Sequence, residues 1–203
     1  MSRRPRIFYL ARTAPSRLSG ATLAMRRHFL DHTDIDIFIA TTEEFEGPAV
    51  PQLTLQAPAW WQRIGRTRLW RAVRNAEILA LAHWLPPELL QAARRFRPDA
   101  VFTVADLTLS DTARLLAQRL GVPLIANFQD WWPRGQFYYP QETPFRFVVP
   151  IVERRFHRLY RNAALAFCTS EGMREFLGPH PNSHVLYPIG DGAARGTTIA
   201  THP

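Results

Sequence analysis

The amino-acid sequence predicts an α/β fold: a doubly wound parallel sheet, Rossmann-like, in a single domain. Short apolar runs rich in β-branched and aromatic residues alternate with segments whose apolar residues recur every three or four positions. The runs are mostly apolar throughout, as is typical of strands covered on both faces. The chain has 203 residues, 46% of them hydrophobic, which is enough for one core of ordinary size.

The first part of the chain begins with a strand predicted at Arg6–Leu10. A loop follows, and then a helix in which Met25 and Phe29 lie one turn apart. A second strand is predicted at residues 34–40, with the sequence Asp-Ile-Asp-Ile-Phe-Ile-Ala. We assign no element between residues 45 and 95.

The second part of the chain repeats a strand-helix-strand pattern. Strands are predicted at residues 98–104 and 122–128, with a helix from Ser110 to Leu120 between them that closes at Gly121. A further helix places Val152, Phe156, Leu159 and Ala163 on one face. Strands at residues 165–169 and 184–187 complete the series. Strands that alternate with helices predict parallel pairing with right-handed crossovers.

Candidate ligand-binding residues, most of them polar, follow four of the predicted strands where each strand ends. They are Arg12, Ser19 and Gly20 after the first strand, Asp106 after the third, Gln129, Asp130, Trp131 and Trp132 after the fourth, and Ser170 and Glu171 after the fifth. Ligands of open α/β sheets bind outside the carboxyl ends of the strands. We therefore expect these residues along one edge of the sheet, although serine and aspartate are also ordinary caps at strand-to-helix turns.

The charged residues and glycines exclude several classes of protein. The chain has 25 basic and 17 acidic residues, and every basic residue is arginine. A Walker A loop requires a lysine, so that class of nucleotide hydrolase is excluded. A nicotinamide-binding domain needs three glycines after its first strand, and only Gly20 is present. Arginine usage without lysine also arises from GC-rich coding sequence, so the charge does not predict a nucleic-acid partner.

No metal site is expected from the sequence. His28 and His32 have the spacing of a zinc pair, but Phe29 stands where the H-E-x-x-H motif has glutamate. The single cysteine, Cys168, can form neither an internal disulfide nor a cysteine-based zinc site. It is most simply a buried strand residue in a reducing compartment.

Several stretches resemble a known family. They are Arg97-Pro-Asp-Ala-Val-Phe, residues 117–125, the Gln-Asp-Trp-Trp-Pro segment at residues 129–133, and residues 162–173 followed by 185–189. These stretches resemble the amino-terminal, acceptor-side domain of family 4 glycosyltransferases, which have the GT-B fold. The resemblance covers residues 5–192. Residues 193–203 show neither helical nor strand periodicity and are expected to form a disordered tail.

The resemblance implies roles for the residues at the strand ends. In this family two Rossmann-like domains face each other across a cleft, the first binding mainly the acceptor and the second the nucleotide sugar. Ser19 and Gly20 would then face the donor phosphates or the transferred sugar, and the other strand-end residues would line the acceptor side of the cleft. The departing phosphate can accept the acceptor's proton in retaining members, and Asp130 is the best carboxylate for a dedicated base. The sequence departs from the family at Gln129, where many members have histidine, and at Ser19, where a glycine pair is common.

The resemblance also implies what the protein needs for activity. The expected reaction transfers a sugar from a nucleotide-sugar co-substrate to a saccharide or lipid-linked acceptor, without a metal or resident cofactor. Because the second half of the family's architecture holds the donor, we expect catalysis only with a separate carboxyl-terminal domain. Two alternatives are a truncated or vestigial saccharide-binding domain without catalysis and part of a nucleotide-sugar epimerase.

The sequence predicts a cytoplasmic location. No apolar run is long enough to span a bilayer, and the run that begins at Ile7 stops at Arg12, too short for a secretory signal. The segment from Trp60 to Arg71 mixes tryptophan and arginine, as membrane-surface segments do. Peripheral contact with the inner face of a membrane is one interpretation of this segment, and packed tryptophans with solvated arginines are the other.

Overall fold

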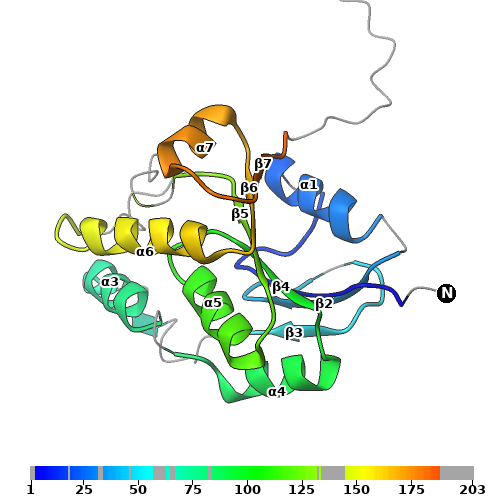
Figure 1. Ribbon diagram of the computed structural model, residues 1–203. Helices are drawn as coiled ribbons and strands as arrows, with labels where there is room; N and C mark the ends of the chain where they lie inside the picture. The colour runs from blue at the N-terminus through cyan, green and yellow to red at the C-terminus, as the bar shows by residue number, and fades with distance from the viewer. Residues whose placement is uncertain are drawn as a thin grey trace, which may run out of the picture.

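A computed structural model describes residues 3–17, 19–31, 34–45, 47–56, 63–64, 67–81, 84–131, 133 and 145–187. In this part of the chain seven parallel strands form one sheet in the order β3-β2-β1-β4-β5-β6-β7 (Figure 1). The strands are β1 (Arg6–Leu10), β2 (Asp36–Thr41), β3 (Gln52–Thr54), β4 (Ala100–Val104), β5 (Leu124–Phe128), β6 (Leu165–Cys168) and β7 (Ser183–Val185). The helices are α1 (Gly20–Phe29), α3 (Trp70–Leu81), α4 (Pro87–Phe96), α5 (Leu109–Leu120), α6 (Val149–Asn162) and α7 (Glu171–Leu177). This architecture confirms the predicted α/β, Rossmann-like fold.

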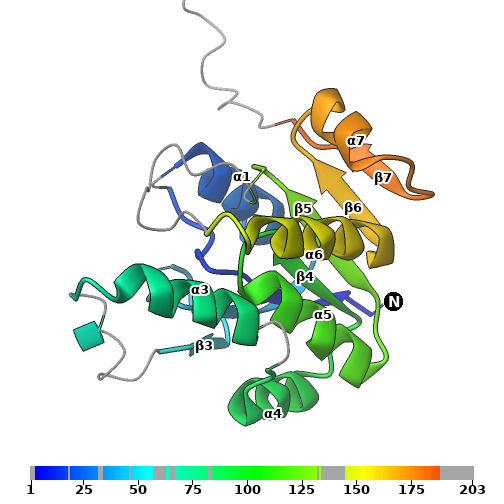
Figure 2. The ribbon, with the colours of Figure 1, turned by 90° about the vertical axis from the view of Figure 1, so that its left-hand side faces the viewer.

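Helices cover both faces of the sheet, which makes it doubly wound. Side chains of a strand point alternately to its two faces. Ile7 and Tyr9 of β1 accordingly pack in one buried cluster with Met25 of α1, whereas Phe8 and Leu10 pack in a second cluster with α4, α5 and α6. Figure 2 shows α3, α5 and α6 in front of the sheet, α4 at the bottom of the view and α1 behind the sheet. The winding reverses between β1 and β4, which lie side by side.

Local sequence sets the ends of the helices. The Ser19 hydroxyl accepts a hydrogen bond from the Thr22 N–H at 3.3 Å, and the Thr22 hydroxyl accepts one from the Ser19 N–H at 3.1 Å, which starts α1 with a reciprocal cap. Helix α4 begins at Pro87, whose fixed φ suits a first helical turn. Helix α5 ends at Gly121, where φ of +70° lies in the left-handed region.

The predicted strands are all present, with ends that differ by at most two residues. Those predicted to start at Pro98 and Val122 begin instead at Ala100 and Leu124. The correction has a simple cause, because Pro98 and Pro123 have no N–H to donate to a strand ladder. The helix predicted from Ser110 starts one residue earlier, at Leu109.

Four elements were not predicted from the sequence. The unassigned region between residues 45 and 95 holds β3, α3 and α4. Strand β3 has only three residues, and α7 has seven, so neither shows a clear period. Helix α4 buries Leu89, Ala93 and Phe96 on one face, a pattern that the sequence does carry. The tail expected at residues 193–203 lies outside the described residues.

Candidate functional site

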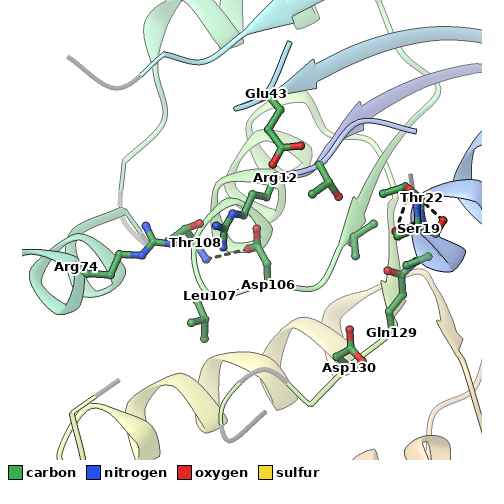
Figure 3. A pocket seen from close by; sticks show the side chains of 13 residues that line it. Arg12, Ser19, Thr22, Glu43, Arg74, Asp106, Leu107, Thr108, Gln129 and Asp130 are labelled. Carbon is green, nitrogen blue, oxygen red and sulfur yellow. Dashed lines mark hydrogen bonds between the residues drawn. The ribbon is translucent and has the colours of Figure 1, made fainter. Parts of the chain in front are cut away.

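A cavity of about 310 Å³ opens at the carboxyl ends of β1, β4 and β5 (Figure 3). Its lining comes from the segments that follow these strands, from the start of α1, and from α3. The lining residues are Arg12, Thr13, Ser19, Ala21, Thr22, Glu43, Arg74, Val104, Asp106, Leu107, Thr108, Gln129 and Asp130. Because β1 and β4 are neighbours from which the chain winds in opposite directions, this is the topological switch point, where open α/β sheets bind their ligands. We call it the switch-point cavity.

The loop after β1 is fixed by hydrogen bonds to its backbone. The buried Tyr9 hydroxyl donates to the Thr13 carbonyl at 3.0 Å, and the Thr42 hydroxyl donates to the Arg12 carbonyl at 3.0 Å. Burial, aided by the negative charges of Asp106 and Glu43, raises the pKa of Tyr9 above its ordinary value, so its hydroxyl stays a donor. These two hydrogen bonds fix the backbone of Arg12 and Thr13, and both residues line the cavity.

The start of α1 contributes Ser19, Ala21 and Thr22 to the cavity wall. Ser19 and Thr22 use their hydroxyls on each other's backbone N–H groups, as the reciprocal cap requires. Gly20, the first residue of the helix, is exposed, and the space around it would admit a Cβ without contact. Gly20 itself is absent from the cavity lining, although both of its neighbours belong to it.

Asp106 is the most deeply set acid of the cavity. Its Oδ1 accepts hydrogen bonds from the Thr108 and Ser110 N–H groups at 2.9 and 3.0 Å, which caps the start of α5. Its Oδ2 is buried and has no hydrogen-bond partner among the described residues. Burial raises the pKa of Asp106, against the opposing effects of the two N–H donors and of the positive charges of Arg12 and Arg74. The carboxyl group is therefore more basic than that of an ordinary aspartate.

Helix α3 brings Arg74 to the cavity. Other residues of this helix, Asn75 and Ile78, contact the rest of the domain. Arg74 forms an ion pair with Glu77 on its own helix. The Asn75 side chain accepts a hydrogen bond from the Phe145 N–H at 2.7 Å. Ile78 is fully buried with Leu107 and with Val148 and Val152 of the α6 region.

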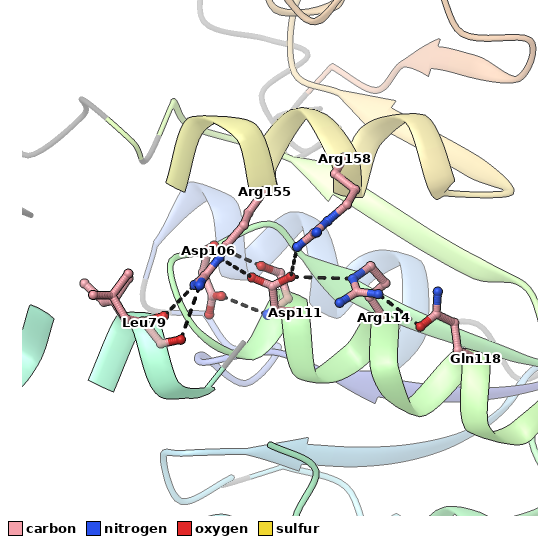
Figure 4. Close-up of polar contacts among 9 residues, drawn as sticks. Leu79, Asp106, Asp111, Arg114, Gln118, Arg155 and Arg158 are labelled. Atoms are coloured by element: carbon pink, nitrogen blue, oxygen red, sulfur yellow. Dashed lines mark hydrogen bonds and ion pairs between the residues drawn. The ribbon is translucent and has the colours of Figure 1, made fainter. Parts of the chain in front are cut away.

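Arg155 of α6 fastens the carboxyl end of α3 (Figure 4). Its guanidinium donates to the carbonyls of Ile78 and Leu79 at 2.7 and 3.2 Å. Asp111 of α5 lies 4.0 Å from the Arg155 Nε and also pairs with Arg114 and Arg158 at 3.5 and 3.7 Å. Asp111 is buried. Through Arg155, the network joins α3, α5 and α6.

The segment after β5 divides between the cavity and the surface formed by α6 and α7. Gln129 and the exposed Asp130 line the cavity, as expected. Trp131 lies instead against α6 and α7, with its ring centroid 5.0 Å from that of Phe156 and 4.6 Å from that of Phe176. The expected placement of Trp132 concerns a residue outside the described part of the chain.

Ser170 and Glu171 lie at the predicted edge, after β6, but outside the cavity lining. The Ser170 hydroxyl accepts a hydrogen bond from the Met173 N–H at 3.1 Å and caps α7. Glu171 pairs with Arg174 at 2.7 Å on the same helix. Ser170 thus has the capping role that strand-to-helix turns ordinarily give serine, and Glu171 lies in the first turn of α7.

The prediction from the sequence omitted several cavity residues. Glu43 lies two residues after the end of β2. The expectation that site residues follow the carboxyl ends of strands would have included it, had it been applied to the second predicted strand. Thr13 and Thr108 lie next to the predicted Arg12 and near Asp106. Arg74 comes from α3, which the sequence did not predict, so no strand-end rule could place it.

Neither a metal centre nor a membrane span is found in the described part of the chain. No group of three or more histidine, cysteine, aspartate or glutamate side chains there is arranged to hold a metal ion. No helix within the described residues has the length and apolar character needed to cross a bilayer.

The fold and the cavity define an α/β domain with a cavity at the switch point of its parallel sheet, and charged and hydroxyl side chains are among the residues that line it. Residues 22–188 match the family model described as the glycosyl transferase 4-like domain. The chain therefore belongs to the glycosyl transferase 4-like domain family, which confirms the family predicted from the sequence. A search of curated proteins gave no match.

Solved structures are similar to this chain at low sequence identity. UDP-GlcNAc 2-epimerase from Neisseria meningitidis, bound to UDP-GlcNAc, is 14% identical with a TM-score of 0.49, over 89% of this chain and 45% of that one. A spinosyn rhamnosyltransferase complexed with thymidine diphosphate is 15% identical with a TM-score of 0.46, over 89% and 49%. UDP-GlcNAc 2-epimerase from Methanocaldococcus jannaschii is 13% identical with a TM-score of 0.42, over 85% and 41%. This chain spans less than half the length of each.

Proposed function

We propose that this domain is the acceptor-binding half of a glycosyltransferase that moves a sugar from a nucleotide sugar onto a saccharide or lipid-linked acceptor. The observation that carries the proposal is the switch-point cavity, with its charged and hydroxyl side chains, in a domain of the glycosyl transferase 4-like family. Its volume falls at the lower end of the range for small-molecule sites, about 300–1,000 Å³. The proposal places the reaction in the cytoplasm.

The lining of the cavity suits a polyhydroxylated molecule. Carboxylates accept hydrogen bonds from sugar hydroxyls, and guanidinium groups donate to them. The cavity offers both kinds of group, with Glu43, Asp106 and Asp130 as acceptors and Arg12 and Arg74 as donors. Gln129 and the threonine hydroxyls can do either. This mixture supports a saccharide as the ligand.

The proposed reaction includes a second domain that holds the nucleotide sugar opposite this cavity. Cleavage of the sugar–phosphate bond leaves negative charge on the nucleoside diphosphate, which preorganised donors in a closed site must stabilise. At the start of α1, where a phosphate would be met, Ser19 and Thr22 already use their hydroxyls in the cap. We therefore assign the diphosphate mainly to the second domain, with Ser19 and Gly20 at its margin, and no metal is part of the proposal.

A reconstitution assay tests this function. Purified chain 1–203 is assayed for release of nucleoside diphosphate from a panel of nucleotide sugars with crude glycan acceptors, alone and with a donor-binding domain of the same family added. We expect acceptor-dependent release only in the mixture. Arg74→Gln lowers that release, whereas Arg94→Gln on the exposed side of α4 leaves it unchanged.

The other outcomes contradict the proposal in distinct ways. Acceptor-dependent turnover by chain 1–203 alone overturns the requirement for a second domain. Saccharide binding without release in any mixture indicates a binding domain without catalysis. Interconversion of the sugar nucleotide in the absence of acceptor indicates part of an epimerase.

A further inference from the structure

The two carboxyl oxygens of Asp106 have different surroundings. Oδ1 is held by the Thr108 and Ser110 N–H groups, whereas Oδ2 is buried without a hydrogen-bond partner among the described residues. The other cavity acids, Glu43 and Asp130, are exposed. Asp106 is thus the one acid of the cavity lining that has a buried carboxyl oxygen free to accept a hydrogen bond.

Capping accounts for only one of the two carboxyl oxygens of Asp106. One acceptor oxygen is enough to hold the Thr108 and Ser110 N–H groups, and the Oδ1 of an asparagine can accept these two hydrogen bonds as that of aspartate does. Burying a second, unpartnered carboxylate oxygen is costly, and native structures rarely leave such an atom unsatisfied without a functional reason. The raised pKa of Asp106 is the electrostatic expression of that cost.

The Arg12 side chain lies beside the Asp106 carboxylate in the cavity wall (Figure 3). Its positive charge acts on Asp106, yet it supplies no hydrogen bond to Oδ2. A sugar hydroxyl can donate one hydrogen bond and accept another at the same time. A hydroxyl placed between these two side chains therefore donates to the carboxylate and accepts from the guanidinium.

We propose that Asp106 and Arg12 form the specificity-determining pair of the switch-point cavity, with one sugar hydroxyl donating to Asp106 Oδ2 and accepting from the Arg12 guanidinium. This inference rests on the proposed function. Oδ2 is covered in the structure, so the hydroxyl reaches it only if the long Arg12 side chain shifts slightly, with its guanidinium still close enough to donate to that hydroxyl. The two N–H bonds to Oδ1 keep the carboxyl group in place during this change.

Asp106→Asn separates the capping role from the recognition role. Asparagine keeps an Oδ1 that can cap α5, and it replaces the accepting Oδ2 by a donating NH₂ group. The matched control is Asp36→Asn, the same chemical change at an exposed position at the opposite edge of the sheet. Urea unfolding of each variant establishes that it is folded.

The probes are the methyl glycosides of common hexoses, N-acetylhexosamines and hexuronic acids, together with their monodeoxy analogues. Each is titrated into ¹⁵N-labelled chain 1–203, and Kd is taken from the amide shifts. For the glycoside that binds best, we expect Asp106→Asn to weaken binding by about 10- to 100-fold, as for loss of a hydrogen bond to a charged group. Asp36→Asn is expected to bind as the unsubstituted chain does.

The deoxy series provides a readout that a purely structural role of Asp106 would not change. One monodeoxy analogue should bind the unsubstituted chain as weakly as the parent glycoside binds Asp106→Asn. The folded Asn variant should then fail to distinguish that analogue from its parent, because the interaction has already been removed.

Two results overturn the inference and separate it from the proposed function. If Asp106→Asn binds the glycosides as tightly as the unsubstituted chain, or still discriminates the same hydroxyl, Asp106 does not read it, and saccharide binding stands. If the unsubstituted chain binds no member of the panel, saccharide binding by this cavity fails, and the inference fails with it.

Discussion

Asp106 should make the stability of the domain depend on pH. Its pKa in the folded protein is raised by burial, whereas an aspartate in the unfolded chain titrates near about 3.9. Between these two values the folded state binds the extra proton, so the free energy of unfolding falls as pH rises through this window. The charged and titratable groups around the carboxyl are Tyr9, Arg12, Glu43 and Arg74 in the cavity region, and Asp111 and Arg155 behind it.

We therefore expect Asp106→Asn to become progressively more stable relative to the unsubstituted chain as pH rises above about 3.9 and through the raised pKa of Asp106. Asparagine does not titrate, so the variant loses the pH-dependent penalty. Urea unfolding of both proteins across this range measures the difference in unfolding free energy. A difference that is constant with pH would show that the folded-state pKa of Asp106 is not raised.

Gly121 and Gly172 form a matched pair for a test of backbone strain. Gly121 caps α5 with φ of +70° in open surroundings, whereas Gly172 lies within α7, and a Cβ there would meet only the Ser170 Oγ at 4.0 Å. Gly121→Ala is expected to destabilise the domain by about 1 kcal/mol, because L side chains disfavour the left-handed region. Gly172→Ala is expected to stabilise α7 by up to about 1 kcal/mol. Urea unfolding measures both, and equal effects would contradict this account.

Helix α3 is the element whose position most depends on distant side chains. It supplies Arg74 to the cavity, and the Arg155 guanidinium binds two carbonyls at its carboxyl end. The same guanidinium faces the buried Asp111 of α5. The attachment of α3 thus depends on residues of α5 and α6 that are not part of the cavity lining.

Arg155→Met should loosen α3 specifically. The substitution keeps an apolar stem and removes both hydrogen bonds to the helix end, which we expect to cost about 1–3 kcal/mol in unfolding free energy. Arg158→Met is the control, because its side chain is 44% exposed and its ion pair with Asp111 contributes about 0–1 kcal/mol. Hydrogen exchange should be faster at the α3 amides in Arg155→Met than in Arg158→Met. Unchanged exchange in α3 would show that Arg155 does not hold this helix.

Elements with strong local signals could be predicted from the sequence. The central strands are short apolar runs, and α5 combines a clear period with its Gly121 cap, so both appear within two residues of their predicted ends. Strand β3 forms through pairing with β2, and such pairing with a distant segment leaves little trace in three residues. Helix α3 is held by Phe145 and Arg155, which lie far along the chain. A local sequence pattern cannot predict such distant contacts.

The candidate site was predictable in outline only. Parallel strands bring Arg12, Asp106 and Asp130 to one edge, as expected, and these three residues do share the cavity. The sequence could not show that Trp131 packs between α6 and α7, because an aromatic residue at a strand end suits a sugar or a core equally well. The sequence also could not show that Ser170 lies outside the cavity, because the alternation of strands and helices does not determine the order of the strands in the sheet.

At the scale of the whole molecule, the strand order places the cavity. The sheet runs β3-β2-β1-β4-β5-β6-β7, with α1 on one face and α4, α5 and α6 on the other. The loops after β1 and β4 therefore diverge, and the switch-point cavity lies between them. The exposed groove lined by Pro150, Arg154, His157 and Leu177, between α6 and α7, is a separate surface with a different mixture of groups.

The most direct test of saccharide binding at the switch-point cavity is a map of amide shifts in ¹⁵N-labelled chain 1–203 on addition of the methyl glycoside panel. Binding at the cavity predicts saturable shifts at the amides of Thr13, Thr22, Thr108 and Gln129, and little change in α7 or along the groove between α6 and α7. Shifts confined to that groove, or no shift with any member of the panel, would contradict the assignment of this cavity as the saccharide site.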